Sequence, residues 1–145
     1  MIRVGLLTTS FPKFNGDSHA PWILEIAKKI NSGSVKVNVM APSDKSLSLS
    51  HNIENVKVER FRYTLKNLEC VAYGANIPSN LKKSWKAKLM FPFFIFGFLF
   101  GAIKLYKNNQ ILHAQFGYSG LFITLASFFL LKKKPMLVSF YGRDV

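Results

Sequence analysis

Cysteine is almost absent from this chain of 145 residues, which contains Cys70 alone. A single cysteine excludes an internal disulfide framework and any metal cluster held by several thiolates. The three histidines, His19, His51 and His113, lie far apart and show no metal-ligand spacing. We therefore expect no metal ion at a functional site.

Signals of secretion are missing too. No Asn-x-Ser/Thr acceptor for glycosylation occurs, and the first apolar run, residues 2–7, contains Arg3 and leads into no cleavage-site pattern. We expect no signal peptide. Together with the single cysteine, this predicts a reducing, cytoplasmic location.

Acidic residues are absent from residues 70–143, which contain ten Lys or Arg. Residues 1–69 contain ten basic and six acidic residues, so most of the formal net charge of +13 belongs to the second half. That half also holds the long apolar runs. Basic residues beside apolar runs are typical of proteins that bind an anionic membrane surface. A nucleic-acid-binding chain would combine basic residues with scattered polar and aromatic ones, so we expect no nucleic-acid partner.

Common motifs for phosphate binding and nucleophilic catalysis are also missing: there is no Walker loop, no GxGxxG turn and no serine nucleophile elbow. The composition, with 49% hydrophobic and 19% charged residues, is that of a folded chain, and the length is that of one domain. Candidate functional residues must therefore be inferred from their places in the predicted fold.

Short apolar or alternating segments predict five strands, at residues 2–8, 35–41, 56–63, 110–115 and 136–140. Helices are predicted over residues 22–30, 89–103 and 118–131, and a polar loop over residues 43–52. Strands that alternate with helices and are this apolar are typical of parallel sheets covered on both faces. The predicted fold class is α/β, a single domain with a Rossmann-like, doubly wound parallel sheet.

Ligands of such sheets bind at the carboxyl ends of the strands, near the point where the strand order reverses. Gly16 lies in the loop before the first helix, where it either makes a turn or lets a phosphate approach the bare backbone at a helix N-terminus. Asp17 either caps that helix or accepts a proton from a hydroxyl group. His113 is either a core histidine bonded to the backbone or a site residue. We expect one open groove to collect four residues: Gly16, His113, Tyr141 and Arg143.

The apolar run at residues 89–103 admits three interpretations. Fifteen helical residues span roughly 22 Å, less than the roughly 30 Å hydrocarbon core of a bilayer. A buried or half-buried core helix and an interfacial membrane helix are the two main alternatives, and a membrane span is the third. A related alternative is a small membrane protein with two spans, residues 89–105 and 118–131. The lysines that precede the run form either a solvated loop or a collar that contacts lipid phosphates: Lys82, Lys83, Lys86 and Lys88.

Five segments, taken in order, resemble the N-terminal half of family-four glycosyltransferases: SFPKFNGDSHAPWILEIAKKI, VKVNVMAPSD, YGANIPSNLKKSWKAKL, ILHAQFGYSG and SFYGRDV. These are GT-B enzymes with two Rossmann-like domains. The resemblance implies a retaining, metal-independent and cofactor-free transfer of a sugar from a nucleotide-sugar donor. It also implies that this half holds the acceptor, which we expect to be lipid-linked or a glycan. The basic and apolar second half of the sequence predicts a peripheral position at the inner face of the membrane.

The resemblance also implies roles for single residues. It assigns the catalytic positions to Asp17, His113 and Tyr141. It assigns donor or acceptor binding to six further residues: Asn15, Gly16, Gln115, Gly142, Arg143 and Asp144. Two positions depart from the family pattern, because Tyr141 stands where His is common and Gln115 stands where an aromatic residue often follows His-Ala.

The family's C-terminal domain, which would hold the nucleotide, has no room in 145 residues. We therefore expect residues 1–145 to be a truncated, acceptor-binding half that is inactive alone. The alternative function is a catalytically silent α/β domain that binds a membrane or a partner protein.

Overall fold

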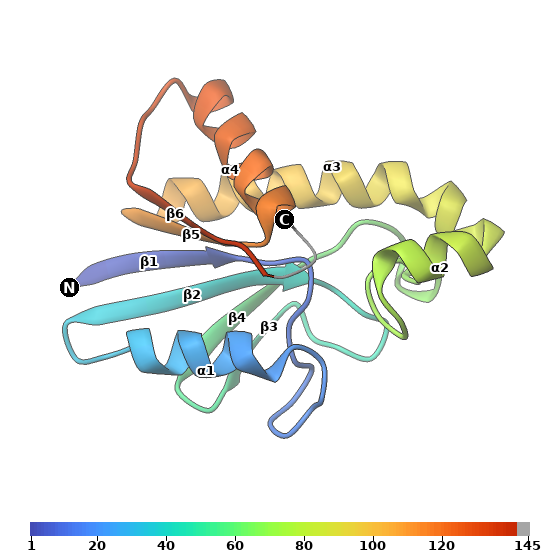
Figure 1. Ribbon diagram of the computed structural model, residues 1–145, viewed down its shortest axis with the longest axis horizontal. Coiled ribbons are helices and arrows are strands. Elements are labelled where there is room, and N and C mark those ends of the chain that lie inside the picture. Colours follow the sequence, from blue (N-terminus) through green and yellow to red (C-terminus); the bar gives the residue numbers. More distant parts are fainter. Residues whose placement is uncertain (142–145) are drawn as a thin grey trace.

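The computed structural model describes residues 1–141 as one α/β domain built on a six-stranded sheet (Figure 1). The strands lie in the order β3-β4-β2-β1-β5-β6. Every neighbouring pair is parallel except β3 and β4, which are antiparallel. The strands are β1 (Ile2–Leu7), β2 (Val35–Pro42), β3 (Ser50–Ile53), β4 (Val56–Phe61), β5 (Ile111–Gln115) and β6 (Met136–Ser139). The predicted α/β, Rossmann-like fold class is confirmed.

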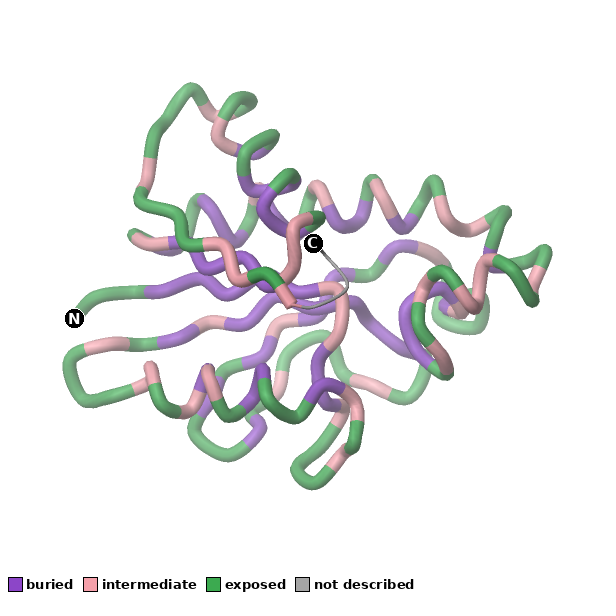
Figure 2. Tube along the Cα trace, viewed as in Figure 1, coloured by how far each residue is buried: buried purple, intermediate pink, exposed green. Residues whose placement is uncertain are grey.

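Helices cover both faces of the sheet (Figures 1 and 2). The amphipathic α1 (Pro21–Ile30) packs its buried side on one face, where the core includes Ile23, Val39 and Val58. The helices α3 (Trp85–Asn108) and α4 (Gly117–Leu130) share a second core cluster on the other face. Burying β-branched and aliphatic strand residues on both faces explains why the parallel strands are nearly continuous apolar runs.

The strand order reverses between β1 and β5. From β1 the chain passes through α1 to β2, and then to β3 and β4, which lie on the same side of β1 as β2. It then returns through α3 to β5, which pairs with the opposite edge of β1. In open sheets of this kind the crevice at such a switch point is the usual place for a ligand.

Three elements escaped the sequence prediction. The predicted polar loop over residues 43–52 runs into β3, whose first three residues are polar because the strand lies at an exposed edge. The Lys-rich segment contains a short helix, α2 (Ile77–Lys83), and a 3₁₀ turn (Lys66–Leu68) precedes it. The Asn76 side chain caps α2 by accepting a hydrogen bond from the Ser79 N–H at 2.8 Å.

Helix α3 has 24 residues, so the prediction that only the uncharged run is helical was wrong. Ser84 caps it, and the flanking lysines lie within it because they are good helix formers with exposed charges. Among residues 1–141, it is the one helix long and apolar enough to cross a membrane, with a mean hydropathy of 1.8, a test that core helices of soluble proteins also pass.

Helix α3 packs along the sheet by means of two glycines on one side, Gly97 and Gly101. A Cβ on Gly97 would lie 2.8 Å from Tyr63 Cβ, so only glycine allows the helix this close to the chain after β4. The buried stripe of α3 also includes Phe94 and Phe98, which contact Phe61 of β4. This packing supports the interpretation of a half-buried core helix over the two-span alternative.

Candidate functional site

The carboxyl ends of β1, β5 and β6 meet at one edge of the sheet. Leu7 of β1 is in register with Ala114 of β5, and Gln115 is in register with Ser139 of β6. The loop that contains Gly16 and the strand end that contains His113 therefore leave the sheet on the same edge, as the predicted topology requires.

Three polar side chains at this edge form a continuous hydrogen-bonded chain with Ser139. His113 Nε2 lies 2.9 Å from Ser139 Oγ and 3.0 Å from Gln115 Nε2. The Tyr141 hydroxyl donates to Gln115 Oε1. His113 and Gln115 are buried and Tyr141 is half-buried, so the chain leads from the interior toward the surface.

The orientation of the Gln115 amide agrees with one protonation state of the histidine. Because Tyr141 donates to the Gln115 carbonyl oxygen, the Gln115 amide nitrogen faces His113 Nε2 and needs an acceptor there. This assigns a neutral imidazole with its proton on Nδ1. Burial also lowers the pKa of His113 below its ordinary value, which agrees with a neutral ring.

The depressed pKa of His113 predicts a pH-dependent stability. The unfolded chain takes up this proton near pH 6.5 and the folded chain only at lower pH, so the free energy of unfolding should fall between about pH 7.5 and about pH 5.5. His51, whose pKa burial and then Arg60 also lower, should add to the fall. Urea unfolding at several pH values measures it. We expect H113Q and H51Q each to reduce the fall and the double variant nearly to abolish it, whereas an unchanged slope would contradict the assigned neutral ring.

Aromatic rings surround Tyr141, at the surface end of this hydrogen-bonded chain. The Tyr141 ring lies 5.1 Å from Phe116 and 6.2 Å from Trp22, centroid to centroid. Trp22 belongs to the first turn of α1 and is 48% exposed. The start of α1 therefore lies beside the ends of β5 and β6, and a half-exposed indole borders the polar chain.

The loop with Asn15 and Gly16 is exposed and turns back on itself. Gly16 has φ +87 and follows Asn15 in a turn closed by the Asp17 N–H to the Phe14 carbonyl at 3.2 Å. Asp17 accepts hydrogen bonds from the backbone N–H groups of Lys13 and His19 at 2.8 and 3.1 Å. Its carboxylate thus stabilises the loop.

The predicted cap of the first helix was wrong. Helix α1 begins at Pro21 after Ala20, a left-handed residue, and no side chain caps it. Gly16 accordingly lies five residues before the helix rather than at its N-terminus, so the expected phosphate site on that helix end is not formed by Gly16. Asn15 and Gly16 remain predicted binding residues of an exposed loop.

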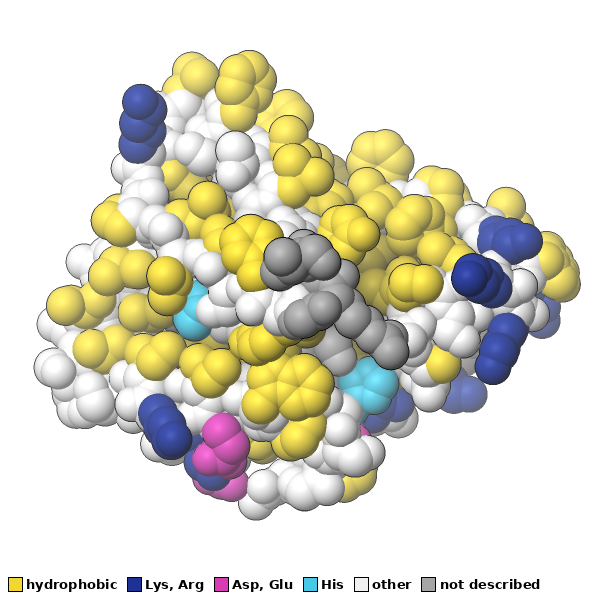
Figure 3. Space-filling view, viewed as in Figure 1, with side chains coloured by type: hydrophobic (Ala, Val, Ile, Leu, Met, Phe, Trp, Pro, Cys, Tyr) yellow, Lys and Arg dark blue, Asp and Glu magenta, His cyan; other side chains and the backbone are white. Residues whose placement is uncertain are grey.

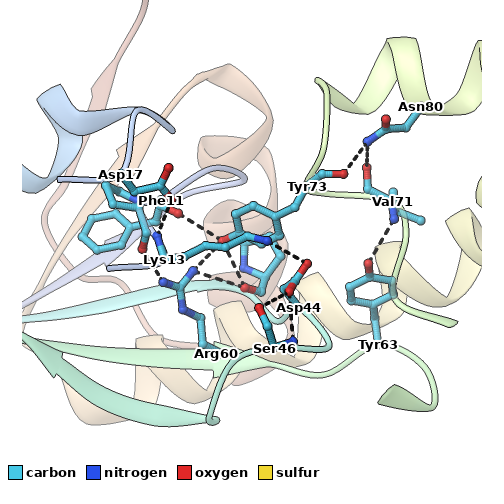
Figure 4. A network of polar contacts seen from close by, with 12 residues as sticks. Phe11, Lys13, Asp17, Asp44, Ser46, Arg60, Tyr63, Val71, Tyr73 and Asn80 are labelled. Carbon is cyan, nitrogen blue, oxygen red and sulfur yellow. Dashed lines mark hydrogen bonds and ion pairs between the residues drawn. The ribbon is translucent and has the colours of Figure 1, made fainter. Parts of the chain in front are cut away.

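A buried arginine, which the sequence analysis missed, anchors this loop (Figure 4). Arg60 of β4 is 4% exposed and donates to the Pro12 carbonyl at 2.5 Å, to the Pro42 carbonyl at 3.4 Å and to the Tyr73 hydroxyl. Tyr73 in turn donates to the carbonyl of Phe11 at 3.2 Å or of Pro42 at 3.3 Å. One guanidinium thus joins the β1–α1 loop to the end of β2 and to the loop before α2.

An ion pair completes the same network. Lys13 Nζ lies 3.0 Å from Asp44 Oδ2 and 4.9 Å from the centre of the Tyr73 ring. Burial opposes the ionisation of Asp44, but hydrogen bonds from Ser46 and Lys13 hold its pKa below the ordinary value. Burial raises the pKa of Tyr73 to about 12, so the phenol stays protonated and able to donate.

Other predicted residues lie apart from this edge or outside the described residues. The lysines of the predicted collar are all exposed, at the end of α2 and the start of α3: Lys82, Lys83, Lys86 and Lys88. Gly142, Arg143 and Asp144 fall outside residues 1–141, and the groove that was to include Arg143 stays a prediction. Within residues 1–141, no cluster of three or more His, Cys, Asp or Glu could hold a metal ion.

Comparison with known proteins identifies a fold. No family model and no curated protein sequence matches the chain. Among solved structures, the chain is similar to sucrose-phosphate synthase from Thermosynechococcus elongatus, with a TM-score of 0.60 and 9% identity. The similarity covers 98% of this chain and 33% of the synthase, so the chain spans about a third of that protein's length. At this identity the likeness shows the fold, and membership of family four stays a prediction.

Proposed function

We propose that this chain is the acceptor-binding part of a glycosyltransferase that uses a nucleotide-sugar donor. The observation that carries the proposal is the chain from His113 through Gln115 to Tyr141, which ends beside Trp22 at the switch point of the sheet. Buried amide and hydroxyl groups next to an aromatic ring suit the polar and apolar faces of a sugar. The fold shared with a third of sucrose-phosphate synthase and the motif resemblance support it.

In such a transfer, the acceptor hydroxyl oxygen forms a bond to the anomeric carbon of the donor. The bond from that carbon to the nucleoside diphosphate breaks, and the hydroxyl proton leaves with the diphosphate or with a basic group. The proposed reaction retains anomeric configuration and needs no metal or cofactor. The nucleotide is proposed to bind on a second domain, outside residues 1–145.

The contacts favour particular roles for the predicted site residues. The lone pair of His113 Nε2 already faces the Gln115 amide, and both oxygens of Asp17 accept backbone N–H groups. These contacts support positioning roles for His113 and Asp17 over direct proton transfer. Tyr141 lies at the surface end of the hydrogen-bonded chain and is the proposed contact to the acceptor, and the buried Gln115 holds its hydroxyl in place.

The indole of Trp22 provides a test. The chain has two tryptophans, so W85F leaves Trp22 as the single reporter beside Tyr141. We expect its fluorescence to change in a saturable way with one class of acceptor, drawn from a panel of oligosaccharides and short-chain glycolipids. Nucleoside diphosphates alone should cause no change. Gln115→Leu should weaken the response about tenfold, the value of one hydrogen bond of about 1.4 kcal/mol.

Gln110 provides the matched control, because it lies just before the amino end of the same strand and accepts the Arg3 N–H at 2.9 Å. Gln110→Leu should leave the response unchanged. No response to any sugar would favour the catalytically silent binding domain, and an equal loss in both glutamine variants would remove Gln115 from the site.

A further inference from the structure

The outward side of α3 and α4 exposes many large apolar side chains. Phe96 and Phe100 of α3 are 60% and 67% exposed, and Phe128 of α4 is 73% exposed. We name this surface the outer helical face. It consists of Leu89, Phe93, Phe96, Phe100, Leu121, Leu125, Phe128 and Phe129.

These side chains are separate from the core. Helix α3 buries a different stripe, which includes Phe94, Gly97 and Phe98, and α4 buries Phe122 and Ile123. The space-filling view shows hydrophobic side chains gathered over α3 and α4 (Figure 3). Soluble monomers rarely expose contiguous apolar patches of this kind without a binding partner.

Basic residues flank the outer helical face at both ends. At one end, α2 and the start of α3 carry four exposed lysines: Lys82, Lys83, Lys86 and Lys88. At the other end, Lys132 and Lys133 follow α4 and are exposed. Figure 3 shows basic side chains on both sides of the hydrophobic region, and the acidic side chains visible in this view lie near α1.

We propose that the outer helical face docks on the surface of an anionic lipid bilayer, with its phenylalanines in the headgroup and acyl boundary and its lysines on lipid phosphates. An anionic bilayer offers apolar depth and negative charge together, which matches both features of the face. This proposal is independent of the proposed transfer reaction, because its readout is lipid binding alone.

The structure favours this occupant over two others. A transmembrane position of α3 would strip its buried stripe from β1, β2 and β4, against which it packs. A second copy of the chain would bring lysines against a surface of the same charge, because residues 70–143 contain no acidic residue. Phospholipid headgroups supply the missing negative charge.

Co-flotation of the full chain with vesicles tests the proposal. We expect binding to phosphatidylcholine vesicles that contain phosphatidylglycerol, much weaker binding to pure phosphatidylcholine, and weakening by salt. Each lysine near an anionic surface contributes roughly fivefold to partitioning, so K82Q/K83Q/K86Q/K88Q should lower it by about 100-fold or more. The matched control, K28Q/K29Q/K36Q/K45Q, removes the same charge from other surfaces and should lower it far less.

Separate variants test how much the apolar side chains contribute to vesicle binding. Phe96→Ser combined with Phe100→Ser should reduce binding about tenfold or more even at low salt, with an unchanged circular dichroism spectrum. Phe14→Ser removes a 63% exposed phenylalanine from the β1–α1 loop and should have no effect. Equal binding to neutral and anionic vesicles, or equal loss in collar and control variants, would overturn the proposal. So would a dimer in sedimentation that the Phe96/Phe100 variant dissociates and that does not bind vesicles.

Discussion

Arg60→Met is expected to lower the free energy of unfolding by about 2–4 kcal/mol, since each buried polar group left without a partner costs about 1–3 kcal/mol. The substitution keeps the apolar stem but leaves the Pro12 carbonyl without its 2.5 Å donor, and it deprives the Pro42 carbonyl and the Tyr73 hydroxyl of a second partner. Urea unfolding followed by circular dichroism measures the loss.

Two further variants make this expectation specific. Tyr73→Phe removes only one member of the network and should cost about 1 kcal/mol. Lys57→Met changes a half-exposed cation on the same strand, whose partner Glu59 keeps Lys104 at 2.7 Å, and should stay within about 0.5 kcal/mol. Burying a charge is itself costly, so a neutral or stabilising Arg60→Met would show that desolvation outweighs the hydrogen bonds.

Gly97→Leu is expected to cost about 3 kcal/mol or more, at the upper end of overpacking effects. The first added carbon would already lie 2.8 Å from Tyr63 Cβ, 3.1 Å from Tyr63 Cα and 3.2 Å from the Arg62 carbonyl oxygen. Backbone and Cβ atoms cannot rotate away, so α3 must move from the sheet. The unfolding midpoint in urea reports the loss.

Substitutions at two other glycines provide comparisons for this effect. A Cβ on Gly101 would lie 3.1 Å from Phe61 Cδ1 and 3.3 Å from Met40 Cγ, which can shift slightly, and 3.2 Å from Phe61 Cβ, which cannot. Gly101→Ala also gains helix propensity, so it should cost less than Gly97→Leu. Gly33→Ala points into open space and should be neutral. A Gly97→Leu variant as stable as Gly33→Ala would show that α3 is free to move away from the sheet.

Strong local patterns explain why much of the fold could be predicted. The apolar run at β1 and the alternation at β2 and β4 gave strands within two residues of those observed, because burial on one or both faces determines such patterns. The polar edge strand β3 and the short helix α2 lack them. Their formation depends on pairing with β4 and on the Asn76 cap, which periodicity does not report.

The candidate site could be predicted in part. Parallel topology places the ends of β1, β5 and β6 at one edge whatever their side chains are, so the meeting of those segments follows from the strand order. The Arg60 network was missed because its partners are distant backbone carbonyls. The sequence did contain a signal. Val56, Val58 and Arg60 occupy alternate positions of one strand, so all three side chains lie on the same, buried face of the sheet. Of the two roles left open for Asp17, the helix cap is not formed, because its carboxylate oxygens accept backbone N–H groups of the loop instead.

The strand order also shapes the synthesis of the protein on the ribosome. The strands against which α3 packs, β1, β2 and β4, all precede it in the chain. Once residue 108 has emerged, the nascent chain already holds the contiguous half-sheet β3-β4-β2-β1, with α1 for one face and α3 for the other. We therefore expect the buried stripe of α3, which includes Phe94 and Phe98, to be covered by this half-sheet before β5 is made. The strands β5 and β6 then extend the free edge of β1 in the order of their translation.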